Sequence, residues 1–161
     1  MPNPILFIFG LIIGSFLNVI SFRYNPETGL LNLRNIGGRS HCLNCQRQLR
    51  WYELIPLFSF LIQRGKCRSC GEKIALQYPL VELASGLIFL LPIYLIPNFQ
   101  FLIPNSLFII QAILWPLAFL IFLLIWTIDY RLYLIPDELN IGLAVLGFLK
   151  IISDSFYNQF S

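Results

Sequence analysis

Charge is scarce in this chain, and its distribution decides the class of protein. Only 12% of the 161 residues are Asp, Glu, Lys or Arg, whereas soluble domains have about 25%. Residues 4–22 and 83–128 contain no charged side chain at all. A helix that crosses a bilayer needs ~20 predominantly apolar residues. These two stretches exclude an ordinary soluble domain and predict a membrane protein with one span in the first stretch and two in the second.

A polar face is also missing from these apolar stretches. A buried helix of a soluble protein carries polar residues along one side, and here no such side exists. No Lys or Arg precedes the apolar core of residues 4–22, and no small-x-small cleavage site follows it. The first stretch is therefore interpreted as a retained membrane helix and not as a cleaved signal peptide.

Basic residues are concentrated between the first two apolar stretches. Nine of the eleven lie there: Arg23, Arg34, Arg39, Arg47, Arg50, Arg64, Lys66, Arg68 and Lys73. Nucleic-acid binding is one interpretation of such a segment, but basic residues beside membrane spans also mark the cytoplasmic side. Residues 98–105 have no charge, which suits the outside. The pattern favours a cytoplasmic loop with the N-terminus outside, and no nucleic-acid partner.

These observations predict an all-α fold, a polytopic membrane helical bundle of about four segments with a small cytoplasmic loop domain. The expected divisions are a first transmembrane helix in 1–22, the loop domain in 23–79 and further bundle helices in 80–161. The expected spans are 4–22, 80–96 and 106–128. A fourth apolar segment, 139–152, is too short to cross unless it is tilted or extended through residue 156.

The chain has four cysteines, and all of them lie in the predicted loop. Cys42 and Cys45 form one C-x2-C pair, Cys67 and Cys70 form another, and 21 residues separate the pairs. Two such turns facing each other complete a tetrahedral four-sulfur zinc site, which is structural because it leaves no open position. His41, the only histidine, is interpreted as a surface neighbour of the site.

Three alternatives to zinc stay open from the residues alone. Two disulfides require an oxidising compartment, and the charge pattern argues for the cytoplasm. A redox dithiol usually needs a single C-x2-C pair, and idle thiols would need no pairing at all. Zinc is the favoured interpretation.

Three carboxylates lie at the predicted ends of membrane segments. Asp129 directly follows an apolar run, and Asp137 comes eight positions later, after Pro136. Interfacial position explains Asp129 without any function, and a helix N-cap explains Asp137. A half-buried carboxylate with a raised pKa, however, can share a proton with a second acid and activate water for amide hydrolysis. Asp137 and Glu82 are the supporting candidates for such a pair.

Several motifs then occur in an order that resembles the bacterial type IV prepilin peptidases. They are GSFLNV at 14–19 with Arg23, RSHCLNC at 39–45, WYELIPLFS at 51–59, GKCRSC at 65–70, YPLVE at 78–82 and the segment from Asp129 to Asp137. Members of this family are aspartic membrane proteases of the GxGD type that are also N-methyltransferases. The resemblance covers residues 10–140.

The resemblance implies a function and a location. It implies that Asp129 is catalytic, and that the leader of a prepilin or pseudopilin is cut at the cytoplasmic face of the inner membrane. The new N-terminus is then methylated from S-adenosylmethionine. The binding site of S-adenosylmethionine is not located, because no glycine-rich nucleotide loop is visible in the sequence.

One expected motif is missing. The family carries its second catalytic aspartate in a Gly-x-Gly-Asp motif on a later span, and this sequence contains none. We therefore expect that the C-terminal part of the enzyme is lacking, through a shortened gene, an early stop or a split subunit. In the last case a second polypeptide would supply that aspartate. The alternative is a non-catalytic zinc-bearing membrane subunit of a pilus or type II secretion assembly.

Overall fold

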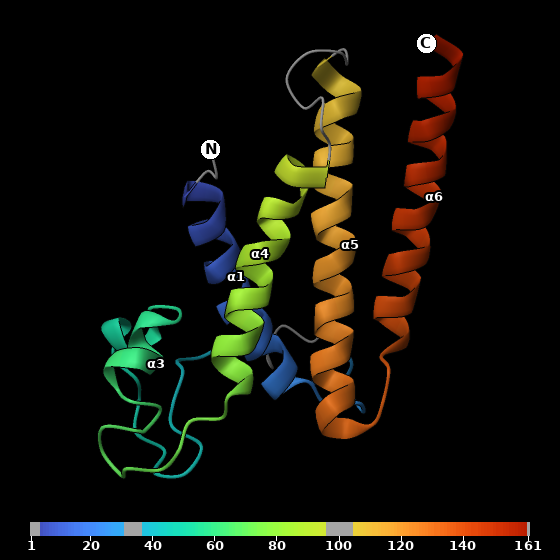
Figure 1. The fold of residues 1–161 in the computed structure, drawn as a ribbon. Coiled ribbons are helices and arrows are strands. Elements are labelled where there is room, and N and C mark those ends of the chain that lie inside the picture. Colours follow the sequence, from blue (N-terminus) through green and yellow to red (C-terminus); the bar gives the residue numbers. More distant parts are fainter. Residues whose placement is uncertain (1–3, 31–36, 96–104, 161) are drawn as a thin grey trace.

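The computed structural model describes residues 4–30, 37–95 and 105–160. Their helices are α1 (Pro4–Arg23), the short η1 (Trp51–Leu54), α3 (Phe58–Ile62), α4 (Gln77–Leu95), α5 (Asn105–Leu132) and α6 (Asp137–Phe160). Four long helices stand side by side, and the loops between α1 and α4 lie at one end of this bundle (Figure 1). Extended pairing within the described ranges is limited to two isolated bridges. The predicted all-helical class is confirmed.

Membrane capacity is clearest in two of these helices. α1 and the Ile113–Leu132 part of α5 are long and apolar enough to cross a bilayer. The Gln77–Pro92 stretch of α4 is apolar but shorter. The expected number of about four spans is therefore approximate, while the membrane character of the chain agrees with the sequence.

The helix boundaries differ from the expected spans in ways that have local causes. α4 begins at Gln77, three residues earlier than expected, because Pro79 is tolerated in the first turn of a helix. α5 continues to Leu132, so Asp129 lies inside its last turn and not after it. α6 runs from Asp137 to Phe160, longer than the expected 139–152 segment. Most of the expected outer turn, 98–104, and the end of the second span at residue 96 lie outside the described residues.

Helices α1 and α4 approach each other closely through small residues. A Cβ atom on Gly10 would lie 2.7 Å from the Gly86 Cα, and one on Gly14 would lie 2.8 Å from the Glu82 Cα. The Ser85 hydroxyl donates a 2.7 Å hydrogen bond to the Gly10 carbonyl oxygen. Helices in lipid gain no hydrophobic free energy by associating, so close backbone contact and interhelical hydrogen bonds hold them together.

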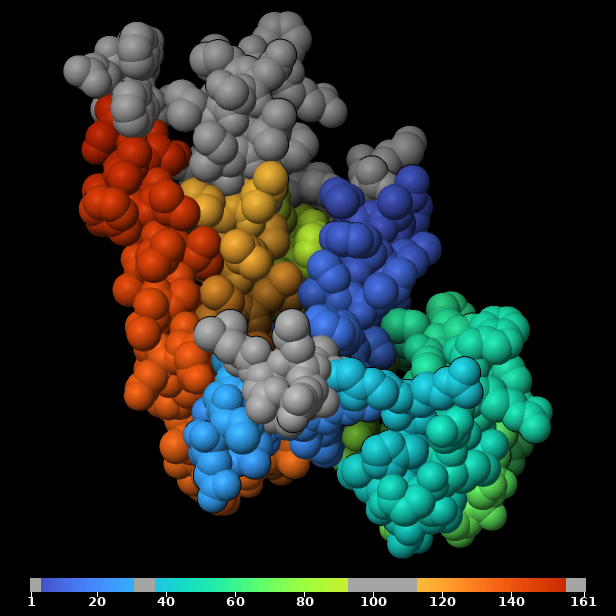
Figure 2. All heavy atoms as spheres, turned by 180° about the vertical axis from the view of Figure 1, so that it is seen from behind, coloured from blue at the N-terminus to red at the C-terminus, as the bar shows by residue number. Residues whose placement is uncertain are grey.

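Helix α5 packs against α1 and α4 through its C-terminal half. Its buried residues pack with α1 and α4 in a core of Leu17, Val81, Leu120, Leu124 and Ile128. Arg131 donates a 2.7 Å hydrogen bond to the Ser21 carbonyl oxygen, and its guanidinium lies 4.1 Å from the Phe22 ring centre. A cation here also complements the negative end of the α1 dipole. Helix α6 then packs on α5, on the side away from the loop domain (Figure 2).

The Gly14 contact makes a testable prediction. Gly14→Ala places a methyl group against α4 backbone, which cannot move aside as a flexible side chain does, so we expect unfolding free energy to fall by about 1–3 kcal/mol. The measurement is thermal unfolding in detergent. Gly147→Ala is the matched control, because nothing lies within 4 Å of its added Cβ. Equal stability of the two variants would contradict the packing argument.

Candidate functional site

The two cysteine pairs lie in two knuckles of the same construction. In the first, the Cys42 N–H donates to the Arg47 carbonyl oxygen at 3.0 Å. In the second, the Cys67 N–H donates to the Glu72 carbonyl oxygen at 2.8 Å. These bonds turn the backbone back on itself directly after the second cysteine of each pair, so that both thiols of a knuckle project to the same side.

The residue after each pair adopts the left-handed conformation that closes the knuckle. Gly71 does so at φ 72°, and Gln46 takes the same region at φ 57°. A glycine carries no steric cost there, whereas a residue with a Cβ does. The Gln46 amide donates a 3.1 Å hydrogen bond to the Leu43 carbonyl oxygen, which stabilises the first knuckle. The glycine alone was visible as a turn signal in the sequence.

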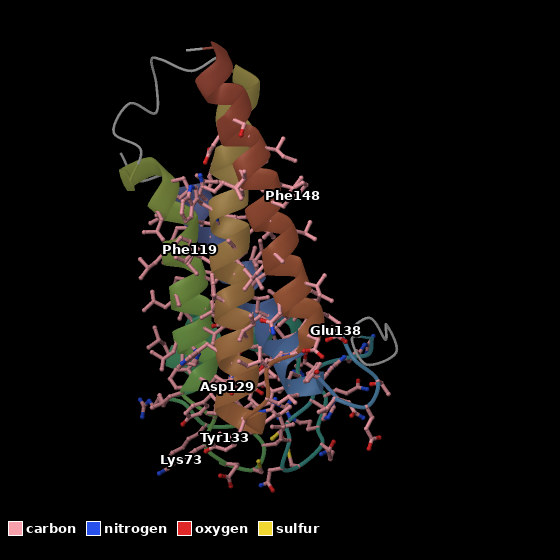
Figure 3. The ribbon with its side chains drawn as sticks, turned by 90° about the vertical axis from the view of Figure 1, so that its right-hand side faces the viewer. Lys73, Phe119, Asp129, Tyr133, Glu138 and Phe148 are labelled. Carbon is pink, nitrogen blue, oxygen red and sulfur yellow. The ribbon has the colours of Figure 1, made fainter. Side chains whose placement is uncertain are left out.

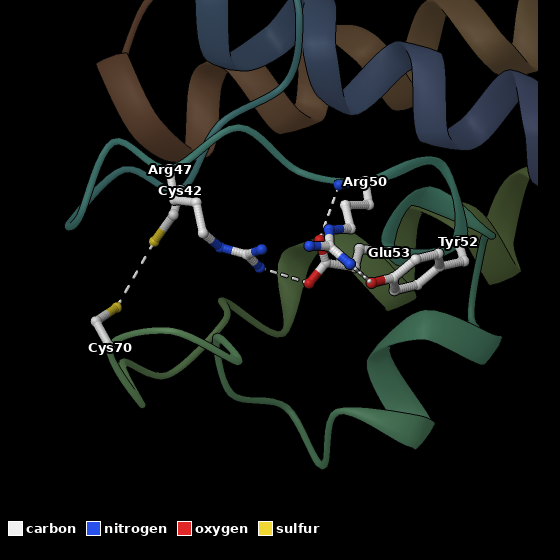
Figure 4. Close-up of polar contacts among 6 residues, drawn as sticks. All are labelled: Cys42, Arg47, Arg50, Tyr52, Glu53 and Cys70. Atoms are coloured by element: carbon white, nitrogen blue, oxygen red, sulfur yellow. Dashed lines mark hydrogen bonds and ion pairs between the residues drawn. The ribbon is translucent and has the colours of Figure 1, made fainter.

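The four thiols meet where the knuckles face each other. Their Sγ atoms all lie within 4.8 Å of one another, and the Cys42 and Cys70 sulfurs are 3.9 Å apart (Figure 4). A tetrahedral centre with ~2.3 Å metal–sulfur bonds separates its sulfurs by ~3.8 Å. All four cysteines are free, so the structure forms neither disulfide. The predicted gathering of the cysteines is confirmed, and the group could hold a metal ion.

The electrostatics of one thiol favour a metal. Backbone N–H groups of Cys70 and Ser69 hydrogen-bond the Cys67 sulfur and lower its pKa to about 6. The thiolate that a metal requires is therefore accessible near neutral pH. His41 is exposed, with its Nδ1 atom 3.4 Å from the Arg39 carbonyl oxygen, and it is not part of the four-sulfur group. This agrees with its interpretation as a surface neighbour.

A partly buried ion pair that the sequence did not suggest stabilises the first knuckle. The Arg47 guanidinium donates a 2.6 Å hydrogen bond to Glu53, whose side chain is fully buried. The backbone N–H of Arg50 donates to the other Glu53 oxygen at 2.8 Å (Figure 4). Burial acts to raise the pKa of Glu53, but these bonds and the charges of Arg47 and Arg68 lower it overall. Glu53 therefore stays ionised and ties the knuckle to η1.

The carboxylate of Glu82 connects the loop domain to the bundle. It is buried on α4, and its Oε2 accepts a 2.8 Å hydrogen bond from the Leu57 N–H. The Ser15 side chain of α1 also hydrogen-bonds to it. Leu57 lies between η1 and α3 and has a positive φ of 59°, a conformation that costs free energy for a residue with a Cβ. Glu82 thus holds a strained turn against two helices.

Asp129 and Asp137 lie at the same end of the bundle on different helices. Asp129 is exposed in the last turn of α5, where its carbonyl oxygen accepts the Tyr133 N–H at 2.8 Å. The sequence argument assumed a half-buried carboxylate, and the exposure of Asp129 differs from that assumption. Asp137 is the first helical residue of α6 and not the cap before it, and an acid there complements the helix dipole. Figure 3 labels Asp129 and Tyr133 at this end, with Glu138 at the start of α6.

Glu138 is a further acid that the sequence argument did not single out. The pKa of Tyr24, just after α1, is raised by burial and by the negative charges of Glu138 and Asp137. Both acids therefore lie near the end of α1. Within the described ranges, only the cysteine cluster brings three or more His, Cys, Asp or Glu side chains together as a metal-binding group. A catalytic partnership of Asp129 with Asp137 or Glu82 stays a prediction.

With the geometry described, comparison with known proteins places the chain in a family. The model of the bacterial peptidase A24 N-terminal domain matches residues 8–96, which is more than half of the chain. The chain belongs to this family. The matched region holds α1, both cysteine knuckles and α4, the elements that Glu82 and the glycine contacts join.

Three curated relatives share the name prepilin leader peptidase/N-methyltransferase. The prepilin leader peptidase/N-methyltransferase of Bacillus subtilis is 41% identical over 160 residues, which cover 90% of this chain and 61% of the relative. That of Vibrio cholerae is 36% identical over 147 residues, 89% of this chain and 54% of the relative. That of Myxococcus xanthus is 46% identical over 84 residues, 52% of this chain and 24% of the relative.

The resemblance inferred from the motifs is thereby confirmed at the level of the family. The chain spans between 24% and 61% of the length of these three relatives. No solved structure matches the chain.

The cysteine geometry predicts about one equivalent of Zn²⁺ in the purified protein. Cys67→Ser should lower the bound zinc and loosen residues 40–75, because the binding energy of a structural zinc is folding energy. Metal analysis by mass spectrometry measures the content. His41→Asn is the control and should keep its metal, since His41 lies outside the sulfur group. A zinc-free protein with a disulfide at Cys42 would show the assignment to be wrong.

Proposed function

We propose that this chain takes part in prepilin processing, in which a leader peptide is cleaved and the new N-terminus is methylated. The observation that carries the proposal is the family membership together with two relatives that match about 90% of the chain. Each of these two relatives is named prepilin leader peptidase/N-methyltransferase. The substrates in this proposal are prepilins or pseudopilins. S-adenosylmethionine is the methyl donor by family resemblance, and its site is not assigned to any residue.

In this proposal Asp129 is the catalytic acid or base. Its support is its place in the last turn of α5, at the end of the bundle where the loop domain lies (Figure 3). An aspartic mechanism needs one carboxylate ionised as base and a second protonated as acid. Asp137 is exposed at the start of α6 and remains a supporting candidate. Glu82 is a weaker candidate, because its carboxylate already accepts the Leu57 N–H and contacts Ser15.

The cysteine group has a structural role in this proposal. Zinc is the ion proposed, because four thiolates in tetrahedral reach suit zinc and fill its coordination. No coordination position is left for a water or a substrate. The metal would hold the two knuckles together, and the Arg47–Glu53 pair would carry that rigidity to η1.

The second acid is proposed to come from elsewhere. This sequence has no Gly-x-Gly-Asp motif, and a further segment or a second polypeptide would supply that aspartate. The second candidate function is a non-catalytic zinc-bearing membrane subunit of a pilus or type II secretion assembly. The engagement of Glu82 by the loop domain favours it, because that contact removes one of the two supporting acids in the chain.

The activity prediction separates these two functions. Residues 1–161 alone should not cleave prepilin, and addition of a C-terminal half with Gly-x-Gly-Asp, fused or separate, should restore cleavage. In the restored enzyme, Asp129→Asn should abolish cleavage, whereas Asp137→Asn should reduce it less if Asp137 mainly stabilises the start of α6. A gel-shift assay of prepilin in membranes measures both.

Two controls sharpen this assay. Glu82→Gln can still accept the Leu57 N–H, so it should keep most of the restored activity if Glu82 is an anchor. Robust cleavage by residues 1–161 alone would mean that both acids are already present. Undiminished cleavage by Asp129→Asn would remove Asp129 from the catalytic role.

The location proposed is the bacterial inner membrane, with the 23–79 loop domain cytoplasmic and the N-terminus outside. Its support is the concentration of nine basic residues in that loop. A phosphatase reporter joined after Lys73 should be inactive, because that enzyme folds only in the periplasm. The same reporter joined after Gln100 should be active. The reverse pattern would invert the topology.

A further inference from the structure

The loop domain carries an exposed apolar surface, here called the η1–α3 patch, that the proposed function does not use. In α3, Phe58, Leu61 and Ile62 stand at i, i+3 and i+4 and so share one helix face. All three are exposed, Leu61 at 70%. The preceding turn repeats the spacing with Trp51, Leu54 and Ile55, and Trp51 is 77% exposed.

The patch is apolar because the polar side chains of the same turn, Tyr52 and Glu53, contact the knuckles instead. Glu53, between Trp51 and Leu54, is buried against Arg47. The Tyr52 ring stacks with the Arg68 guanidinium at 5.3 Å on the knuckle side. Within η1, Tyr52 and Glu53 therefore contact residues of the cysteine knuckles, while Trp51 and Leu54 stay exposed. A domain surrounded by water on all sides would not expose large aromatic and aliphatic side chains in this way.

The Glu82 hydrogen bond sets the level of the patch relative to the bundle. Leu57, in the middle of the patch, is bonded to Glu82, which lies five residues into α4. At 1.5 Å per residue this is about 7 Å from the start of that helix. In Figure 1, α3 accordingly lies beside the lower turns of α1 and α4. The sulfur atoms, yellow in Figure 3, lie at the end of the bundle where Tyr133 is labelled.

The surroundings at this level match a lipid interface. On α4, Leu80, Leu83 and Leu87 share a face and are exposed, as expected of lipid-facing residues at the same level. Arg64 and Lys66, directly after α3, are exposed cations. Aromatic side chains beside cations are typical of the headgroup region, where the ring is partly in the acyl chains and the cation meets lipid phosphate.

We propose that the η1–α3 patch inserts into the lipid headgroup region of the bilayer that α1 and α5 cross, and so anchors the loop domain on the membrane surface. The occupant is the bilayer and not a protein partner, because the patch is held at the level of the transmembrane turns. The anchor would add a further attachment of the domain, beside its chain connections to α1 and α4 and the Glu82 bond. It does not depend on the chain being a peptidase.

Tryptophan fluorescence tests the proposal on the full chain in vesicles that contain phosphatidylglycerol. Trp115→Phe with Trp126→Phe leaves Trp51 as the sole tryptophan. The control adds Trp51→Phe and Leu43→Trp, which moves the probe to an exposed apolar position in the first knuckle. A spin label near the lipid headgroup should quench Trp51 at least about twofold more than the control. Aqueous acrylamide should show the opposite order.

Three results are distinguishable. Lipid quenching of Trp51 supports the anchor, and Leu61→Trp in the tryptophan-free background should repeat it. Quenching by acrylamide alone would overturn the proposal, because the patch would then face water. Protection from both quenchers would also overturn it, since a protein surface would then cover the patch. If these variants fail to fold, a photoactivatable lipid on the unaltered chain should label residues 51–62 and spare 42–46.

Discussion

The close approach of α1 and α4 is the contact on which the rest of this structure depends. Gly10 and Gly14 allow the two backbones to touch, and Ser85 bonds across the gap. Because membrane helices gain no hydrophobic free energy from each other, this steric fit decides their pairing. The pairing then brings Glu82 against α1, at the level where the loop domain is attached.

From that contact a chain of polar bonds reaches the cysteine cluster. Glu82 holds Leu57, the turn around Leu57 connects α3 to η1, and Glu53 in η1 holds Arg47 beside the first knuckle. Each link uses a buried carboxylate, and removal of either acid would leave donors without partners at a cost of about 1–3 kcal/mol each. The position of the first cysteine knuckle is therefore tied to helix packing within the bundle.

Much of the candidate site could be predicted because it lies in short segments of sequence. Two C-x2-C pairs indicate paired thiols from local turn geometry alone, and the structure brings their sulfurs together. The carboxylates were harder. Asp129 was expected at the edge of a span, yet α5 continues through it, since nothing in residues 129–132 interrupts a helix before Tyr133. No sequence pattern indicated the role of Glu53, because its partner Arg47 is brought to it by the path of the loop and not by helical spacing.

The sequence by itself determined the membrane character, the helical class, the two C-x2-C pairs and the family. These follow from composition and from contiguous motifs, which need no knowledge of what lies across the chain. Only the tertiary structure decided that Glu82 holds the loop domain through the Leu57 N–H and that Arg47 and Glu53 form a partly buried ion pair. It also decided that the η1–α3 patch lies level with the membrane helices. Burial and partner choice depend on residues far apart in the chain, and these meet only after α1 and α4 have packed.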